Sequence, residues 1–135
     1  MSNKLVEDIK QEEGFRQFPY YCTEGKLTIG YGFNLDDVGI DEEEAELLLM
    51  HRLKKTINAV NSSLYDYDMK PEAWDILYQM AYQMGVSGLL KFKKMLTALK
   101  KQDYEEASKE GKDSLWYKQT TNRAERLMNQ MKSLA

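Results

Sequence analysis

Residues 20–33 have the sequence YYCTEGKLTIGYGF. The segment Thr23–Lys26 is polar and contains a glycine, which is typical of a turn. From residue 27 to residue 33, bulky side chains alternate with small ones, which is typical of a strand with one bulky and one small face. The stretch therefore predicts a β-hairpin whose first strand begins near Arg16 and whose second strand comprises residues 27–33.

Helical patterns flank the hairpin on both sides. Before it, apolar residues recur at helical spacing from Leu5 to Ile9, and Gly14 ends the segment. After it, Asp41 and Glu44 predict a capping box that begins a helix ending near Val60. Further helices are predicted over residues 71–84, 89–99, 103–110 and 121–132. We therefore expect an α+β fold, with a small β-hairpin lobe over about residues 14–40 and a larger helical lobe formed by the rest.

The composition excludes several classes of protein. The chain has 135 residues with one Cys and one His, too few for a disulfide framework or a zinc site of Cys and His. It lacks a run of about 18 apolar residues and the apolar region of a secretory signal. The net charge of −3 disfavours nucleic acid as the main partner, although Lys and Arg outnumber Asp and Glu after residue 84. We expect one monomeric domain made in the cytoplasm, with no metal or other cofactor and no stable membrane insertion.

Three side chains that are suited to catalysis lie in or next to the hairpin. Glu13 stands at the end of the first predicted helix, and Cys22 and Thr28 stand on facing strands. A carboxyl, a thiol and a hydroxyl would then surround one cleft between the hairpin lobe and the helical lobe, a set of groups that suits acid–base chemistry. Taken singly, the three have ordinary interpretations as a solvated helix end, a small buried residue and a strand residue.

Three blocks of the sequence resemble the phage-type lysozymes, or endolysins, of glycoside hydrolase family 24. The first block is the series Glu13, eight residues, Cys22, five residues and Thr28, which is similar to the family's pattern of Glu, Asp or Cys, and Thr, together with the hairpin sequence EGKLTIGYG. The second is QMAYQMG at residues 79–85, and the third is WYKQTTNRA at residues 116–124. The blocks occur in the family's order and span most of the chain.

The resemblance implies a lysozyme-like fold with the active-site cleft between its lobes. It implies a muramidase that hydrolyses the β-1,4 bond between N-acetylmuramic acid and N-acetylglucosamine in bacterial peptidoglycan and lyses the host cell. Glu13 would be the general acid, and Cys22 and Thr28 would place the attacking water. The residues implied in substrate binding are Gln83, Trp116, Gly30 and Tyr31, and Arg123 is implied in supporting the catalytic glutamate. The enzyme would reach the wall from the host cytoplasm after a holin-like membrane lesion.

The thiol of Cys22 leaves the mechanism open. Glycosidases normally use two carboxyl groups, and the second position here is a cysteine. A neutral thiol would help Thr28 to place water, whereas a thiolate would act as a nucleophile or as an electrostatic partner. Asp36 and Asp37 are the nearest spare carboxylates; they suit a turn, and either is also a candidate for the missing second carboxyl group.

Two other functions also fit these residues. A lytic transglycosylase would cleave the same bond with only Glu13 essential, and would leave an anhydro sugar. A catalytically inactive cell-wall-binding module would keep the fold without turnover. Products with reducing ends, products with anhydro ends, and wall binding without products separate the three hypotheses.

Overall fold

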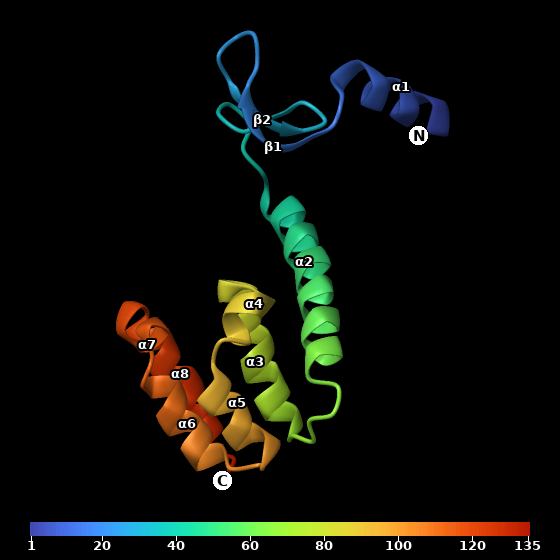
Figure 1. Cartoon of the computed structure of the whole chain (residues 1–135). Coiled ribbons are helices and arrows are strands. Elements are labelled where there is room, and N and C mark those ends of the chain that lie inside the picture. Colours follow the sequence, from blue (N-terminus) through green and yellow to red (C-terminus); the bar gives the residue numbers. More distant parts are fainter. The chain divides into compact units, whose positions relative to one another are not determined.

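The computed structural model describes all residues, 1–135, and contains eight helices and one three-stranded antiparallel sheet (Figure 1). The chain divides into two compact units, Met1–Leu48 and Leu49–Ala135. The predicted α+β class is confirmed. None of the eight helices combines the length and apolar character that crossing a bilayer requires.

The first unit joins one helix to the small sheet. Helix α1 (Asn3–Glu13) begins at Ser2, whose hydroxyl oxygen accepts the backbone N–H of Leu5 at 3.2 Å. The sheet has the order β1-β2-β3, formed by β1 (Arg16–Tyr21), β2 (Leu27–Gly30) and β3 (Phe33–Asn34). Strands β1 and β2 pair antiparallel on either side of the predicted turn (Figure 1). The unit thus holds α1 in addition to the predicted hairpin lobe.

The predicted second strand over residues 27–33 is wrong in its second half. Strand β2 ends at Gly30, the chain turns at residues 31 and 32, and β3 begins at Phe33. The physical reason is that Gly30 and Gly32 have φ angles of +67° and +72°, which reverse the chain direction and which other residues adopt at a cost. The single alternating strand is therefore a short strand, a turn and a third strand.

Helix α2 (Glu42–Ser63) begins in the first unit and continues into the second. Its capping box forms as predicted, because Asp41 Oδ1 accepts the N–H of Glu44 at 2.8 Å and Glu44 Oε1 accepts the N–H of Asp41 at 3.0 Å. The predicted break after Val60 is wrong: Asn61 and both following serines remain helical.

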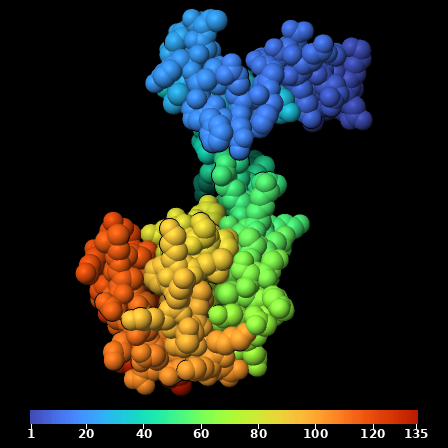
Figure 2. Space-filling model, viewed as in Figure 1, coloured from blue at the N-terminus to red at the C-terminus, as the bar shows by residue number.

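The second unit is a bundle of helices around one apolar core, drawn from green to red in Figure 2. Its helices after α2 are α3 (Pro71–Met84), α4 (Val86–Leu89), α5 (Lys93–Lys100), α6 (Tyr104–Lys112), α7 (Leu115–Gln119) and α8 (Thr121–Lys132). The fully buried core includes Leu77, Met80, Leu89, Leu99 and Met128. Every buried apolar residue of the chain lies between Val60 and Met131.

Two features of the bundle differ from the sequence prediction. The five-residue helix α7 is an additional element, and Gly111 lies inside α6 instead of ending it. A Cβ atom at Gly111 would overlap the sulfur of Met128 and lie 3.4 Å from that of Met95. The glycine thus allows close packing between helices, which outweighs its low helix propensity.

Candidate functional site

The carboxyl group of Glu13 lies against the backbone of Gly32. Glu13 is the last residue of α1, and Gly14 ends the helix by donating its N–H to the carbonyl of Lys10 at 2.8 Å. A Cβ atom at Gly32 would lie only 2.8 Å from the carboxyl carbon of Glu13 and closer still to one carboxyl oxygen. The absence of a side chain at Gly32 therefore creates the space that the Glu13 carboxyl group occupies.

The neighbouring turn is lined by aromatic rings. The rings of Tyr31 and Phe15 have centroids 5.6 Å apart, and the ammonium of Lys10 lies 5.7 Å from the centre of the Tyr31 ring. At Gly30, the ring of Phe33 lies 2.9 Å from the position that a Cβ atom would take. The space left by the two glycines is thus filled, by Phe33 at Gly30 and by Glu13 at Gly32.

Cys22 and Thr28 meet across the turn that joins β1 and β2. The backbone N–H of Cys22 and the hydroxyl of Thr28 both donate to the carbonyl of Lys26, each at 2.9 Å. Thr28 is only 4% exposed, whereas Cys22 is partly exposed. The pair is therefore held by one shared acceptor, with the thiol on the accessible side.

The turn lowers the pKa of the Cys22 thiol. The largest cause is the backbone hydrogen bond from Lys26, followed by the one from Glu24, and the Thr28 hydroxyl acts in the same direction. Partial burial and the negative charge of Glu24 oppose these donors without cancelling them. The arrangement therefore shifts the equilibrium of Cys22 toward the thiolate.

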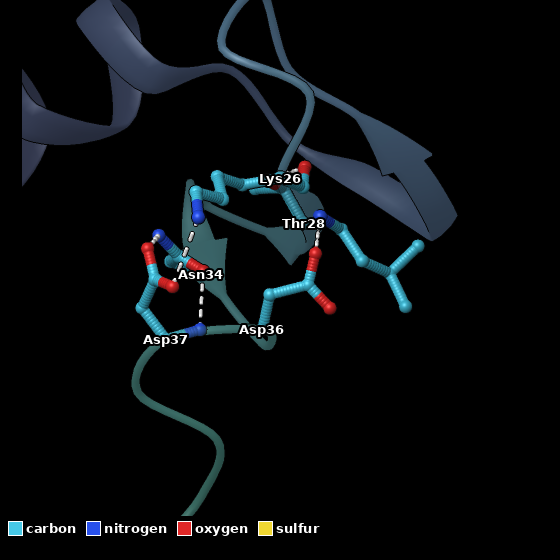
Figure 3. A network of polar contacts seen from close by, with 6 residues as sticks. Lys26, Thr28, Asn34, Asp36 and Asp37 are labelled. Carbon is cyan, nitrogen blue, oxygen red and sulfur yellow. Dashed lines mark hydrogen bonds and ion pairs between the residues drawn. The ribbon is translucent and has the colours of Figure 1, made fainter.

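Asp36 and Asp37 are engaged in holding the turn after β3 against β2 (Figure 3). Asp36 Oδ2 accepts the backbone N–H of Leu27 at 2.7 Å. Asp37 pairs with the ammonium of Lys26 at 3.1 Å, and its other oxygen accepts the side-chain N–H of Asn34 at 3.1 Å. These bonds favour the interpretation of both carboxylates as turn residues.

In the second unit, Gln83 and Trp116 contact each other directly. The indole N–H of Trp116, on α7, donates to Gln83 Oε1 near the end of α3 at 3.1 Å. The Trp116 ring is 8% exposed and meets the ring of Phe92 edge-on, with centroids 5.9 Å apart. Arg123 lies in the first turn of α8 and is partly exposed.

A groove of about 510 Å³ borders Trp116. Its apolar lining comes from the rings of Trp116 and Phe92 and from Met95, and lysines and acidic side chains surround it. The groove beside Trp116 is thus lined by positively charged, negatively charged and aromatic side chains.

The candidate residues fall into two groups by unit. Glu13, Cys22, Thr28, Gly30 and Tyr31 belong to Met1–Leu48, and Gln83, Trp116 and Arg123 belong to Leu49–Ala135. Sequence reasoning missed two contributors in the first group. One is the contact of Gly32 with Glu13, for which the Gly-Tyr-Gly spacing was a signal, and the other is the donation by the backbone of Glu24 and Lys26, for which residue types give no signal.

An α+β fold with a carboxyl group beside a three-stranded sheet and a larger helical bundle defines a lysozyme-like protein. The model of the phage lysozyme family matches residues 10–133. The chain therefore belongs to the phage lysozyme family.

Three relatives show how the similarity is distributed. The chain is 32% identical over 152 residues to the pre-baseplate central spike protein of Enterobacteria phage T4, in an alignment that covers 91% of this chain and 26% of that protein. It is 28% identical over 161 residues to the probable T4-type lysozyme 1 of Dictyostelium discoideum, covering 96% and 94% of the two chains. It is 28% identical over 114 residues to an endolysin of Acyrthosiphon pisum secondary endosymbiont phage 1, covering 82% and 76%.

The chain lacks segments that two of these proteins contain. The first two alignments span 152 and 161 positions, more than the 135 residues of the chain, so those relatives contain segments that this chain lacks. The chain spans about a quarter of the spike protein, at 26% of its length, and nearly all of the Dictyostelium protein.

The reactivity of Cys22 should report the donors of the turn. We expect the rate of alkylation by iodoacetamide to rise with pH around a midpoint below that of a cysteine in a short unstructured peptide measured in parallel. Thr28→Val removes the hydroxyl group that lowers the pKa of Cys22, so it should raise the midpoint. The larger effects of the Lys26 and Glu24 backbone on this pKa remain. Thr23→Val, in the same turn, is the control and should leave the midpoint unchanged. A wild-type midpoint at or above that of the peptide cysteine would contradict this account.

Proposed function

We propose that this member of the phage lysozyme family is a muramidase that hydrolyses the β-1,4 bond between N-acetylmuramic acid and N-acetylglucosamine in bacterial peptidoglycan. The observation that carries the proposal is the Glu13 carboxyl group held over Gly32, in a chain whose residues 10–133 match the family. Relatives named as a T4-type lysozyme and an endolysin support this substrate class.

In this mechanism Glu13 is the general acid. Its carboxyl group donates a proton to the glycosidic oxygen as the bond to the sugar C1 breaks, and positive charge develops at C1 and the ring oxygen. Glu13 can turn toward a substrate because its side chain is exposed, while the Gly32 contact limits the positions of its carboxyl group. Such restriction of a reacting group lowers the entropic cost of reaching the transition state.

Cys22 and Thr28 act on the attacking water. A thiolate at Cys22 accepts the proton that water loses as its oxygen bonds to C1, while the Thr28 oxygen accepts the second hydrogen bond from that water. The lowered pKa of Cys22 supports this role, because a base must be unprotonated at the working pH. The same thiolate is also suited to direct attack on C1, and the stereochemistry of the product distinguishes the two routes.

The second unit supplies the substrate-binding residues in this proposal. Trp116 is mostly buried and borders the groove, so it offers the exposed edge of its ring to a sugar, and its hydrogen bond to Gln83 fixes the indole. Arg123 supports the catalytic glutamate, and Gly30 with Tyr31 forms the turn beside it. The partner is peptidoglycan, and we propose that the protein acts as a monomer that lyses the host after a holin-like lesion admits it to the wall.

A lytic transglycosylase is the second candidate, and the thiol in place of a second carboxyl group favours it. In that reaction the nucleophile that attacks C1 is the 6-hydroxyl of the muramic acid and not a water molecule. No residue is then required to deprotonate an attacking water. The turn donors that favour a thiolate at Cys22 support hydrolysis over this alternative.

Glu13→Gln tests the general acid. We expect the rate of wall clearing to fall about 10²- to 10⁴-fold, because an amide cannot donate the proton, while binding to sedimented cell walls persists. Glu12→Gln, the adjacent exposed glutamate, is the control and should keep its activity. Mass spectrometry of the wild-type products should find reducing ends; anhydro ends would establish transglycosylation, and wall binding without products would identify an inactive module.

Gly32→Ala tests whether the contact with Gly32 positions the Glu13 carboxyl group. The new Cβ atom would overlap that group, so we expect kcat to fall at least tenfold through displacement of the acid. Gly39→Ala is a matched control, because Gly39 also has a positive φ, of +64°, and its Cβ would meet nothing closer than 4.0 Å. Equal activity losses in both variants would assign the effect to backbone strain alone.

Replacement of Cys22 separates its possible roles. Cys22→Asp should retain activity, because a carboxylate at this position also accepts a proton, whereas Cys22→Ala should lose most of it. The measurement is the initial rate of wall clearing, together with the anomeric form of the first product. Full activity in Cys22→Ala would show that the thiol is dispensable.

A further inference from the structure

The orientation of Trp116 depends on a very short helix. Helix α7 has five residues, Leu115–Gln119, and a helix of this length is not stable by itself. At its start, the Ser114 hydroxyl accepts the N–H of Tyr117 at 3.2 Å and donates to the carbonyl of Gly111 at 2.6 Å. These bonds fix the beginning of α7, and its remaining turn needs other contacts.

A group of four side chains provides such contacts on the outer side of α7. The hydroxyl of Tyr117 donates to the carboxylate of Glu125 on α8. The carboxylate of Glu125 also lies 3.7 Å from the ammonium of Lys112 on α6 and 3.4 Å from the side-chain nitrogen of Asn129. Lys112 in turn donates to the side-chain oxygen of Asn129 at 3.0 Å. We call this group, which links α6, α7 and α8, the Tyr117 clamp.

The clamp is centred on the side-chain oxygens of Glu125, which face Tyr117, Lys112 and Asn129. The pKa of Glu125 is lowered first by the Tyr117 hydroxyl and then by Lys112, while the same carboxylate raises the pKa of Tyr117. Both directions correspond to a neutral phenol that donates to an ionised carboxylate, which is a stronger hydrogen bond than one between two neutral groups. The four side chains are only partly buried or exposed, so the clamp contributes little to the core of the bundle.

The side chains of Trp116 and Tyr117 extend from the same helical turn in different directions. Successive residues of an α-helix point about 100° apart, so Tyr117 reaches α8 while the Trp116 ring packs inward against Phe92. The indole then donates to Gln83, and the Trp116 carbonyl accepts the hydroxyl of Thr120 at 2.9 Å. A rotation of α7 that loosened Tyr117 would therefore also turn the indole away from Gln83.

We propose that Tyr117 and Glu125 are positioning residues that hold the Trp116 indole in the orientation in which it binds glycan. This inference rests on the proposed function, because it assigns the Trp116–Gln83 pair to glycan binding. The clamp acts on affinity and not on the chemical step, since neither Tyr117 nor Glu125 belongs to the unit that carries Glu13.

The test combines spectroscopy with binding and turnover. In Tyr117→Phe and in Glu125→Ala, the indole N–H resonance of Trp116 should shift and broaden in a ¹⁵N spectrum, and Trp74→Phe assigns the only other indole resonance. The dissociation constant for a soluble oligomer of N-acetylglucosamine, and KM for cell walls, should each rise about three- to tenfold, the effect expected from one lost hydrogen bond. The value of kcat should stay within about twofold.

A conservative variant of Glu125, a variant outside the clamp and a double variant serve as controls. Glu125→Gln keeps an oxygen that accepts from Tyr117, and it should restore most of the indole position and affinity that Glu125→Ala loses. Gln130→Ala, an exposed change on α8 outside the clamp, should alter neither measurement. In the double variant of Tyr117 and Glu125, the loss of affinity should be no larger than in the stronger single variant.

The outcomes distinguish this inference from the proposed function. An unmoved indole resonance in Tyr117→Phe and Glu125→Ala, or unchanged glycan affinity despite a moved resonance, would overturn the positioning role. If the wild-type protein binds the oligomer and cleaves no wall, the proposed hydrolysis fails, while the resonance and affinity measurements still decide the role of the clamp.

Discussion

The close approach of the Glu13 carboxyl group to the backbone of Gly32 is the contact on which the candidate chemistry depends. It requires a residue without a side chain, and Gly32 has a positive φ angle at the end of the turn between β2 and β3. The end of α1 is fixed as well, because Gly14 closes that helix directly after Glu13. The position of one carboxyl group therefore constrains a helix end, a turn and the length of a strand at the same time.

The second element of the chemistry is supplied mainly by backbone groups. In the proposed mechanism Cys22 takes the role that a carboxylate usually has in glycosidases, and a thiol is a poor base when it is neutral. The N–H groups of Lys26 and Glu24 shift the thiol toward its anion, in the way that turn amides bind other anions. In the proposed mechanism, this turn would give the thiol part of the anionic character that a carboxylate has by itself.

The sequence pattern predicted elements that depend on local chemistry and missed those that depend on packing. The Asp41–Glu44 capping box and the helix predicted over residues 71–84 follow from local sequence signals, and both form. Helix α7 and the continuation of α6 through Gly111 depend on the distant residues Glu125 and Met128, which no local pattern reveals. For the site, motif spacing indicated Glu13, Cys22 and Thr28, whereas the role of Gly32 required the three-dimensional path of the turn.

The two units hold their candidate residues by different physical means. In Met1–Leu48, glycine conformations and turn hydrogen bonds fix Glu13 and Cys22. Each of these constraints depends on a single local feature, such as the missing Cβ atom of Gly32 or one backbone φ angle. In Leu49–Ala135, Trp116 sits at the edge of a methionine-rich core, where neighbouring side chains can adjust to a change of shape. A core of this kind tolerates substitutions that conserve volume, but it positions a ring at its edge less rigidly. The polar contacts of Trp116 and Tyr117 supply the direction that the core does not, because a hydrogen bond fixes an angle and apolar packing mainly fixes a volume.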